Sequence, residues 1–239
     1  MSARALAAVA VVYGVGLGIV QPWIAHHEAE AARRAGPAGI ERMRRAAWLK
    51  PLHPDYPQDL AMAILNSGPP SPERYAEAYR LIAQARRLKP IDPRFPLFLG
   101  RLEALAGDRL FVDPGAAGRA TALYLEAIEL APCDPRPRLE FAHHLADHGD
   151  PTGALDQVRA ALVVEPHFVR ARIVEASTLL SLQRNAEAAE SRDLLDTTLE
   201  ALRGFVPQSG YADEIVRDAP EARARIEAQL SREPMRSKG

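Results

Sequence analysis

One short phrase recurs along this chain and constrains its fold more than any other feature. An alanine is followed five residues later by a proline at Ala46–Pro51, Ala85–Pro90, Ala127–Pro132 and Ala161–Pro166. A small residue stands seven positions before each of these alanines, namely Gly39, Ala78, Ala120 and Ala154. Small residues seven apart lie on one helix face, where a second helix can pack closely, and the proline ends the helix. A period of 34 to 42 residues with this content predicts an all-α fold of stacked helical hairpins.

The phase of the repeat predicts where the helices lie. Four helix pairs are expected. They are 20–33 with a helix that ends near 49, 54–65 with 71–89, 93–106 with about 114–130, and a helix that starts at 135 with one over 154–164. A fifth copy begins near residue 168, so the stack holds about four to five hairpins. A last helix, from residue 219 or 220 to 230, is expected to cover the open end of the stack.

The third copy is longer than the others. It carries about eight extra residues within 108–118, including the apolar Leu110, Phe111 and Val112. We expect these three side chains to dock on the neighbouring hairpin. The alternative is that they contact a partner.

Composition and motifs argue against several classes of function. The net charge is −1 at pH 7, which gives no overall attraction to nucleic acid. The single cysteine, Cys133, excludes an intrachain disulfide and a multi-cysteine metal site. The sequence also lacks a glycine-rich phosphate loop and a nucleophile elbow. We therefore predict a protein that is not an enzyme and that needs no cofactor.

The start of the chain predicts a membrane anchor. Residues 5–25 carry no charge, and 21 residues in a helix span about 30 Å, the thickness of the bilayer core. Abundant alanine and arginine with only three lysines suggest a bacterial source. The expectation is a single-pass protein of the bacterial inner membrane, whose membrane helix also supplies the first helix of the first hairpin. The alternative is a cleaved signal peptide with its site at Ala29-Glu30-Ala31.

The membrane orientation is open on the sequence. Arginines after the apolar run, such as Arg33 and Arg34, place the following domain in the cytoplasm, whereas the short N-terminal tail favours the periplasm. We favour the periplasmic side. The expected organisation is an anchor over 1–27, helical repeats over 28–203, a capping segment over 204–230 and a disordered tail over 231–239.

The repeat pattern resembles the tetratricopeptide repeat (TPR) family. The second-helix pattern of that family is matched by Ala78-Ile82-Ala85-Pro90, Ala120-Tyr124-Ala127-Pro132 and Ala154-Val158-Ala161-Pro166. The first-helix pattern is matched, for example, by Leu60-Ala61 with Ile64. Glu103 and Glu175 depart from it, because each stands where the family has an apolar residue. The resemblance implies a right-handed superhelix that binds proteins.

A weaker resemblance concerns organisation alone. An apolar segment followed by such repeats looks like the C-terminal region of bacterial O-antigen polymerase and ligase proteins. None of the catalytic membrane part of those proteins is present in this sequence. The resemblance implies at most an accessory to envelope polysaccharide polymerisation.

The TPR resemblance also implies which residues line the inner surface of the repeats. The fourth residue after each proline is Asp55, Arg94, Arg136 and Arg170, and the residue seven further on is Met62, Arg101, His143 and Ser177. Guanidinium groups bind carboxylates, so a peptide C-terminus or an acidic segment of a partner is the expected ligand. Our predicted partner-binding residues are Arg94, Arg101, Arg136, His143 and Arg170. The alternative is that these arginines pair with nearby acids such as Asp92 and Asp134.

A histidine cluster on the same stretch invites a metal interpretation. The cluster holds His143, His144 and His148, of which the last two are one helical turn apart, and Asp147 is adjacent. The sequence HHLADH lacks the glutamate of the zinc-protease pattern, and no third ligand is fixed elsewhere. We therefore predict no metal site.

These observations favour a membrane-anchored scaffold or accessory subunit that binds a protein partner in a bacterial membrane or envelope complex. One alternative is a structural subunit of an integral-membrane enzyme or bioenergetic complex, held through its transmembrane helix. Another is the accessory to polysaccharide polymerisation.

Overall fold

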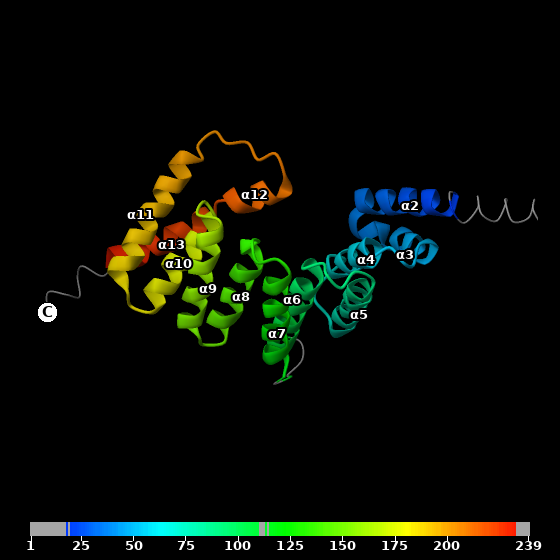
Figure 1. Ribbon diagram of the computed structural model, residues 1–239, viewed down its shortest axis with the longest axis horizontal. Helices are drawn as coiled ribbons and strands as arrows, with labels where there is room; N and C mark the ends of the chain where they lie inside the picture. The colour runs from blue at the N-terminus through cyan, green and yellow to red at the C-terminus, as the bar shows by residue number, and fades with distance from the viewer. Residues whose placement is uncertain (1–17, 19, 110–112, 114, 233–239) are drawn as a thin grey trace, which may run out of the picture. The chain divides into compact units, whose positions relative to one another are not determined.

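The computed structural model describes residues 18, 20–109, 113 and 115–232. These residues form helices joined by turns (Figure 1), in agreement with the predicted all-α fold. In chain order the helices are α2 (Gln21–Ala35), the 3-10 helix η2 (Gly36–Gly39), α3 (Ile40–Leu49), α4 (Asp55–Leu65), α5 (Pro72–Leu88), α6 (Arg94–Arg109), α7 (Ala116–Leu130), α8 (Pro135–Asp147), α9 (Pro151–Val164), α10 (Val169–Ser181), α11 (Asn185–Ala201), α12 (Gly210–Val216) and α13 (Pro220–Arg232).

The repeated phrase does what its spacing predicts. The alanines at both of its positions, from Ala46 and Ala78 to Ala154 and Ala161, are fully buried. Gly39 is buried as well, and a Cβ atom added to it would lie 2.3 Å from the backbone oxygen of Ala32. Each proline of the phrase comes two residues after a helix end, at Leu49, Leu88, Leu130 and Val164. The small residues therefore set how closely the paired helices approach.

The chain divides into two compact units, residues 1–123 and 124–239, which we call unit 1 and unit 2. In unit 1, α2 pairs with α3 and α4 pairs with α5, and α6 packs on α5. One core gathers Ala25, Ala29 and Ala32 of α2 against Met43 and Leu60. A second core joins α4, α5, α6 and the start of α7 around Ile82, Phe95 and Leu99. The first expected hairpin helix, over residues 20–33, is α2.

The prediction of a membrane helix over residues 5–25 is contradicted by the structure. Residues 1–17 and 19 lie outside the described part of the chain. Within the described part, no helix has the length and apolar character needed to cross a bilayer. The end of the predicted span enters α2, an amphipathic helix that carries Glu28, Glu30, Arg33 and Arg34 and packs on α3. The predicted single-pass location in the inner membrane, with a periplasmic domain, is contradicted by the same finding.

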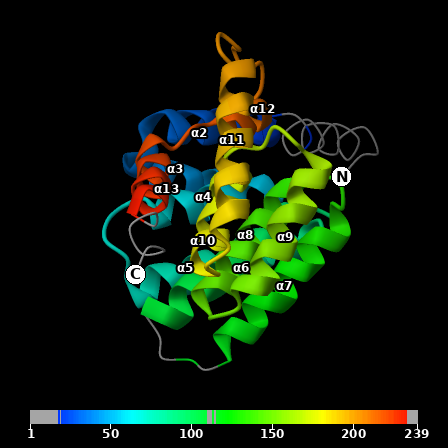
Figure 2. The ribbon, with the colours of Figure 1, turned by 90° about the vertical axis from the view of Figure 1, so that its left-hand side faces the viewer.

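In unit 2, the hairpins are α8 with α9 and α10 with α11, and α10 also packs on α9. The helix expected at the end of the stack is α13, which packs on α10 and α11 and buries Ile226. Helix α12 was not expected. The segment between α11 and α12 projects beyond the hairpins of unit 2 in both views (Figure 1 and Figure 2), and the chain then returns so that α12 packs on α10.

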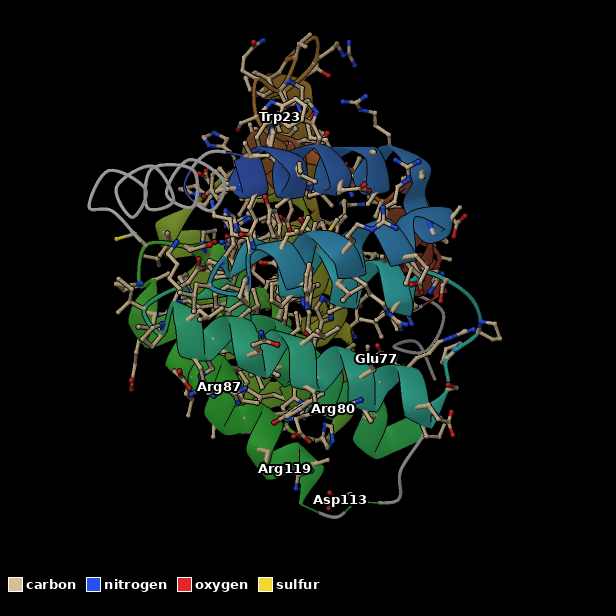
Figure 3. The ribbon with its side chains drawn as sticks, turned by 90° about the vertical axis from the view of Figure 1, so that its right-hand side faces the viewer. Trp23, Glu77, Arg80, Arg87, Asp113 and Arg119 are labelled. Carbon is tan, nitrogen blue, oxygen red and sulfur yellow. The ribbon has the colours of Figure 1, made fainter. Side chains whose placement is uncertain are left out.

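The long third copy shows how a departure from the family pattern is accommodated. Its apolar Leu110, Phe111 and Val112 lie outside the described residues. Arg119, at the start of α7, contacts Asp113, which follows these three residues, and the buried Glu103 of α6, which precedes them. Figure 3 shows Arg119 and Asp113 near each other at one edge of unit 1, with Arg80 of α5 in the same view.

Candidate functional site

The corners that precede α6 and α8 share one side-chain arrangement. Both carry the sequence Pro-x-Asp-Pro-Arg, at residues 90–94 and 132–136. Asp92 Oδ1 accepts a hydrogen bond from the backbone N–H of Arg94 at 3.1 Å, and Asp134 Oδ1 accepts one from Arg136 at 3.0 Å. The guanidinium of the same arginine also donates to this carboxylate, at 2.8 Å for Arg94 and 2.6 Å for Arg136. Each aspartate therefore supports the helix start and fixes the arginine beside it.

The electrostatics of these corners follow from the short contacts. The hydrogen bond from the Arg94 side chain, followed by those from Lys89 and the Arg94 N–H, holds the pKa of the Asp92 carboxyl well below its usual range. The Asp92 carboxylate raises the pKa of Arg94 in return, and Asp134 raises that of Arg136. Arg94 and Arg136 therefore form the ion pairs with nearby acids that the alternative describes.

In unit 1, two residues that were predicted to line the inner surface of consecutive repeats contact each other. Arg94 Nη2 of α6 lies 3.1 Å from Asp55 Oδ1 of α4. These are the residues that the resemblance places on the inner surface of the second and third copies. Arg94 therefore holds two carboxylates at once, from Asp92 and Asp55.

The next pair of residues predicted for the inner surface, seven positions further on in each repeat, lines a cavity of about 290 Å³ between α4, α5 and α6. Met62 of α4 and Arg101 of α6 both contribute to its lining. The guanidinium of Arg101 lies 5.7 Å from the ring centroid of Phe98, within the range of a cation–π contact. This cavity places a charged group beside an apolar surface.

In unit 2, two predicted arginines meet on one carboxylate. Arg136 Nη1 of α8 lies 3.4 Å from Glu214 Oε2, and Arg170 Nη1 of α10 lies 3.8 Å from Glu214 Oε1. The guanidinium of Arg136 also lies 5.1 Å from the ring centroid of Tyr211. Both Glu214 and Tyr211 belong to α12, so a segment of the chain itself contacts these arginines.

An apolar contact holds the same helix. Ile215 is 4% exposed and belongs to a core cluster. The cluster includes Leu139 and Ala142 of α8, the N-cap residue Phe168 of α10, and Ala171 of α10. The sequence reasoning missed these α12 residues. One local signal was present, because Ser209 is a good N-cap residue, and its Oγ accepts a hydrogen bond from the N–H of Ala212 at 3.1 Å.

The histidines of α8 have different environments. His143 is exposed, whereas His144 is buried and its ring lies 4.2 Å from that of His148 and 5.5 Å from that of Tyr124. His148 Nδ1 lies 2.8 Å from the backbone oxygen of His144. Among the described residues, no group of three or more His, Cys, Asp or Glu side chains is arranged to hold a metal ion.

The two glutamates that depart from the family pattern are both buried and paired. Glu103 accepts hydrogen bonds from Arg119 at 3.0 and 2.7 Å. Glu175 of α10 accepts hydrogen bonds from Arg172 and from Ser191 Oγ, each at 2.9 Å, and from Arg159 at 3.3 Å. These carboxylates connect neighbouring helices inside each unit.

Together, the hairpins and their buried small residues define a tetratricopeptide-repeat fold. MamA superposes with a TM-score of 0.60 at 12% identity, covering 81% of this chain and 98% of that one. TTC0263, a thermophilic TPR protein of Thermus thermophilus, gives a TM-score of 0.60 at 17% identity, with 87% and 99% covered. YrrB, described as a TPR protein with an unusual peptide-binding site, gives 0.53 at 18%, with 81% and 89% covered.

The other comparisons add no relative. Neither the protein-family models nor the curated protein sequences gave a match to this chain. The weaker resemblance to O-antigen polymerase and ligase proteins gains no support from these comparisons.

Proposed function

We propose that this chain is a protein-interaction scaffold and that it holds a segment of a partner protein in the cavity between α4, α5 and α6. The observation that carries the proposal is the lining of that cavity. Met62 and Arg101, at equivalent inner positions of consecutive repeats, come together there beside an apolar surface. The fold supports this use, since YrrB, with a similar fold, is described as having a peptide-binding site.

The lining indicates the chemistry of the bound segment. Apolar side chains dominate it, among them Leu65, Ile82, Phe98, Leu102 and Leu105. Two arginines, Arg74 and Arg101, also line it, and none of the described lining residues is an aspartate or a glutamate. An apolar side chain next to a carboxylate suits this combination, because the first fills the cavity and the second accepts hydrogen bonds from an arginine.

Two further residues that were expected on the inner surface lie on the same helix faces as the cavity lining. Asp55 and Met62 are seven residues apart on α4, and Arg94 and Arg101 are seven apart on α6, so each pair shares a helix face. In unit 2, Arg136 and the exposed His143 share a face of α8 in the same way. We assign Arg94 to the edge of the interaction surface in unit 1, and His143 to the edge of the inner face of α8 in unit 2.

A peptide selection with matched variants tests the proposal. A phage-displayed peptide library is selected on the full chain, and the affinities of the recovered synthetic peptides are measured by fluorescence anisotropy. Arg101→Glu should weaken them at least tenfold, because a charge-assisted hydrogen bond contributes about 1.5–3 kcal/mol and about 1.4 kcal/mol is a factor of ten.

The control is Arg87→Glu, at an exposed arginine of α5 that does not line the cavity (Figure 3). It should leave the affinity unchanged. Peptides that bind Arg101→Glu as tightly as the parent chain would place the binding surface elsewhere and contradict the proposal.

A further inference from the structure

Helix α12 contacts the inner surface of unit 2 in the manner of a bound ligand. Its Glu214 carboxylate bridges Arg136 of α8 and Arg170 of α10, which occupy equivalent positions in consecutive repeats. Its Tyr211 ring lies against the guanidinium of Arg136, and its Ile215 enters the apolar core of the hairpins. Charge, aromatic and aliphatic contacts therefore all come from one short segment outside the repeats.

The attachment of α12 is limited in extent. Within its seven residues, Ile215 is the buried one, and Tyr211 is 39% exposed. The Glu214 contacts are partly exposed to solvent, which weakens ion pairs. The preceding segment carries Gly204 at φ +81° and exposes Phe205 and Val206, so little packing restrains it. A competing segment with the same chemistry has few contacts to replace.

The positive charge beneath α12 is held by the hairpins and not by α12. Arg136 is fixed by Asp134, whose carboxylate is contributed by the corner before α8. The apolar surface from Leu139, Ala142 and Ala171 belongs to α8 and α10 themselves. An acidic amphipathic helix fits this surface if an aromatic residue is followed three positions later by an acid and four positions later by an aliphatic residue, as in Tyr211, Glu214 and Ile215.

We propose that the inner face of α8 and α10 binds an acidic amphipathic helix of a partner protein, and that α12 is an intramolecular ligand that covers this face until the partner displaces it. The inference concerns unit 2 and stands independently of the cavity proposed in unit 1. It explains why the chain places a short helix of this chemistry between the last hairpin and α13.

The test uses the full chain and a labelled synthetic peptide of residues 207–218. In the full-length variant Glu214→Lys with Ile215→Asp, α12 is released, and the peptide should bind at least tenfold more tightly than it binds the parent chain. Adding Arg136→Glu and Arg170→Glu to the released variant should abolish binding. An alanine-based helical peptide that keeps only the tyrosine, glutamate and isoleucine should also bind, and the same peptide with lysine in place of glutamate should not.

Several outcomes would overturn the proposal. They are equal affinity for the parent and released chains, binding that survives the charge reversal, and no binding to the released chain. Circular dichroism checks the fold of each variant, and Ile215→Ala replaces the double variant in the same comparison if that variant does not fold. If ultracentrifugation shows a dimer of the parent chain that the released variant loses, the site serves a second copy of the chain rather than another protein.

The cavity variant separates the two proposals. Arg101→Glu, introduced into the released chain, should leave the affinity for the 207–218 peptide unchanged. Loss of that affinity would mean that the peptide binds in unit 1, which contradicts the assignment to α8 and α10.

Discussion

Arg119 of α7 donates two hydrogen bonds to the buried carboxylate of Glu103 in α6, from Nε at 3.0 Å and from Nη2 at 2.7 Å. The two residues are 16 positions apart, and the same separation recurs between Glu175 and both Arg159 and Ser191 in unit 2. Where the family pattern has an apolar residue, this chain has instead a carboxylate that joins two helices. The pairing makes these carboxylates part of the helix packing.

Removal of Arg119 alone should destabilise unit 1. Arg119→Ala leaves the buried Glu103 carboxylate without its bidentate partner, which costs about 1–3 kcal/mol. The double variant Glu103→Leu with Arg119→Ala should recover most of this loss, because the apolar residue removes the stranded charge. Urea unfolding followed by circular dichroism measures both. Equal losses in the single and double variants would contradict this account of the pair.

The pH dependence of stability should reflect Asp92. Its pKa is lowered in the folded chain from a usual value of 3.8, so its contribution is fully present above that value and is lost as the pH falls below it. Asp92→Asn should therefore lower the urea midpoint at pH 7, and its difference from the parent chain should shrink between about pH 4 and pH 2. The control is Asp193→Asn, whose side chain is 70% exposed, so that its ion pair with Arg192 contributes little and the urea midpoint at pH 7 should stay close to that of the parent chain.

Two glycines should respond in opposite directions to alanine. At Gly39 a Cβ atom would lie 2.3 Å from the Ala32 oxygen, so Gly39→Ala should destabilise the α2–α3 hairpin by about 1–3 kcal/mol. At Gly118, within α7, nothing lies within 4 Å of the added atom, and Gly118→Ala should stabilise the helix by about 0.5–1 kcal/mol. Thermal unfolding compares them, and a shift of both in one direction would contradict the packing described.

Ile215→Ala should open α12 without unfolding its neighbours. Truncation of a buried isoleucine to alanine lowers stability by about 2 kcal/mol or more. A loss of about 2 kcal/mol in the local stability of α12 corresponds to about 30-fold faster hydrogen exchange there. Hydrogen exchange read by mass spectrometry should show this change over residues 209–217, with α8 and α9 little affected. Uniform acceleration across unit 2 would show instead that α12 is an integral part of the core.

The hairpins were predictable because a short spacing rule decides them. An alanine seven residues after another small residue, with a proline five further on, fixes a buried helix face and a helix end at once. The membrane prediction failed at the same point where this rule begins to apply. Ala25, at the end of the uncharged run over 5–25, is buried with Ala29 and Ala32 where α2 packs on α3. A count of uncharged residues does not distinguish a residue that packs on a neighbouring helix from one that faces lipid.

The surroundings of the arginines were only partly predictable. Asp92 and Asp134, two residues before Arg94 and Arg136, signalled the corner pairs. The contact of Arg136 and Arg170 with Glu214 was not predictable, because Glu214 is 78 residues after Arg136 and belongs to a helix outside the repeat. A seven-residue helix with one buried side chain carries too little periodicity to be recognised from sequence.

The shared Pro-x-Asp-Pro-Arg corners have a consequence for how such a chain lengthens. The Asp–Arg pair and the helix-start hydrogen bond of each corner lie within five consecutive residues. A gene segment that runs from one corner to the next therefore encodes an Asp–Arg pair and a helix start at each end. Tandem duplication of that segment would add a helical hairpin that keeps an Asp–Arg pair at each of its two connections.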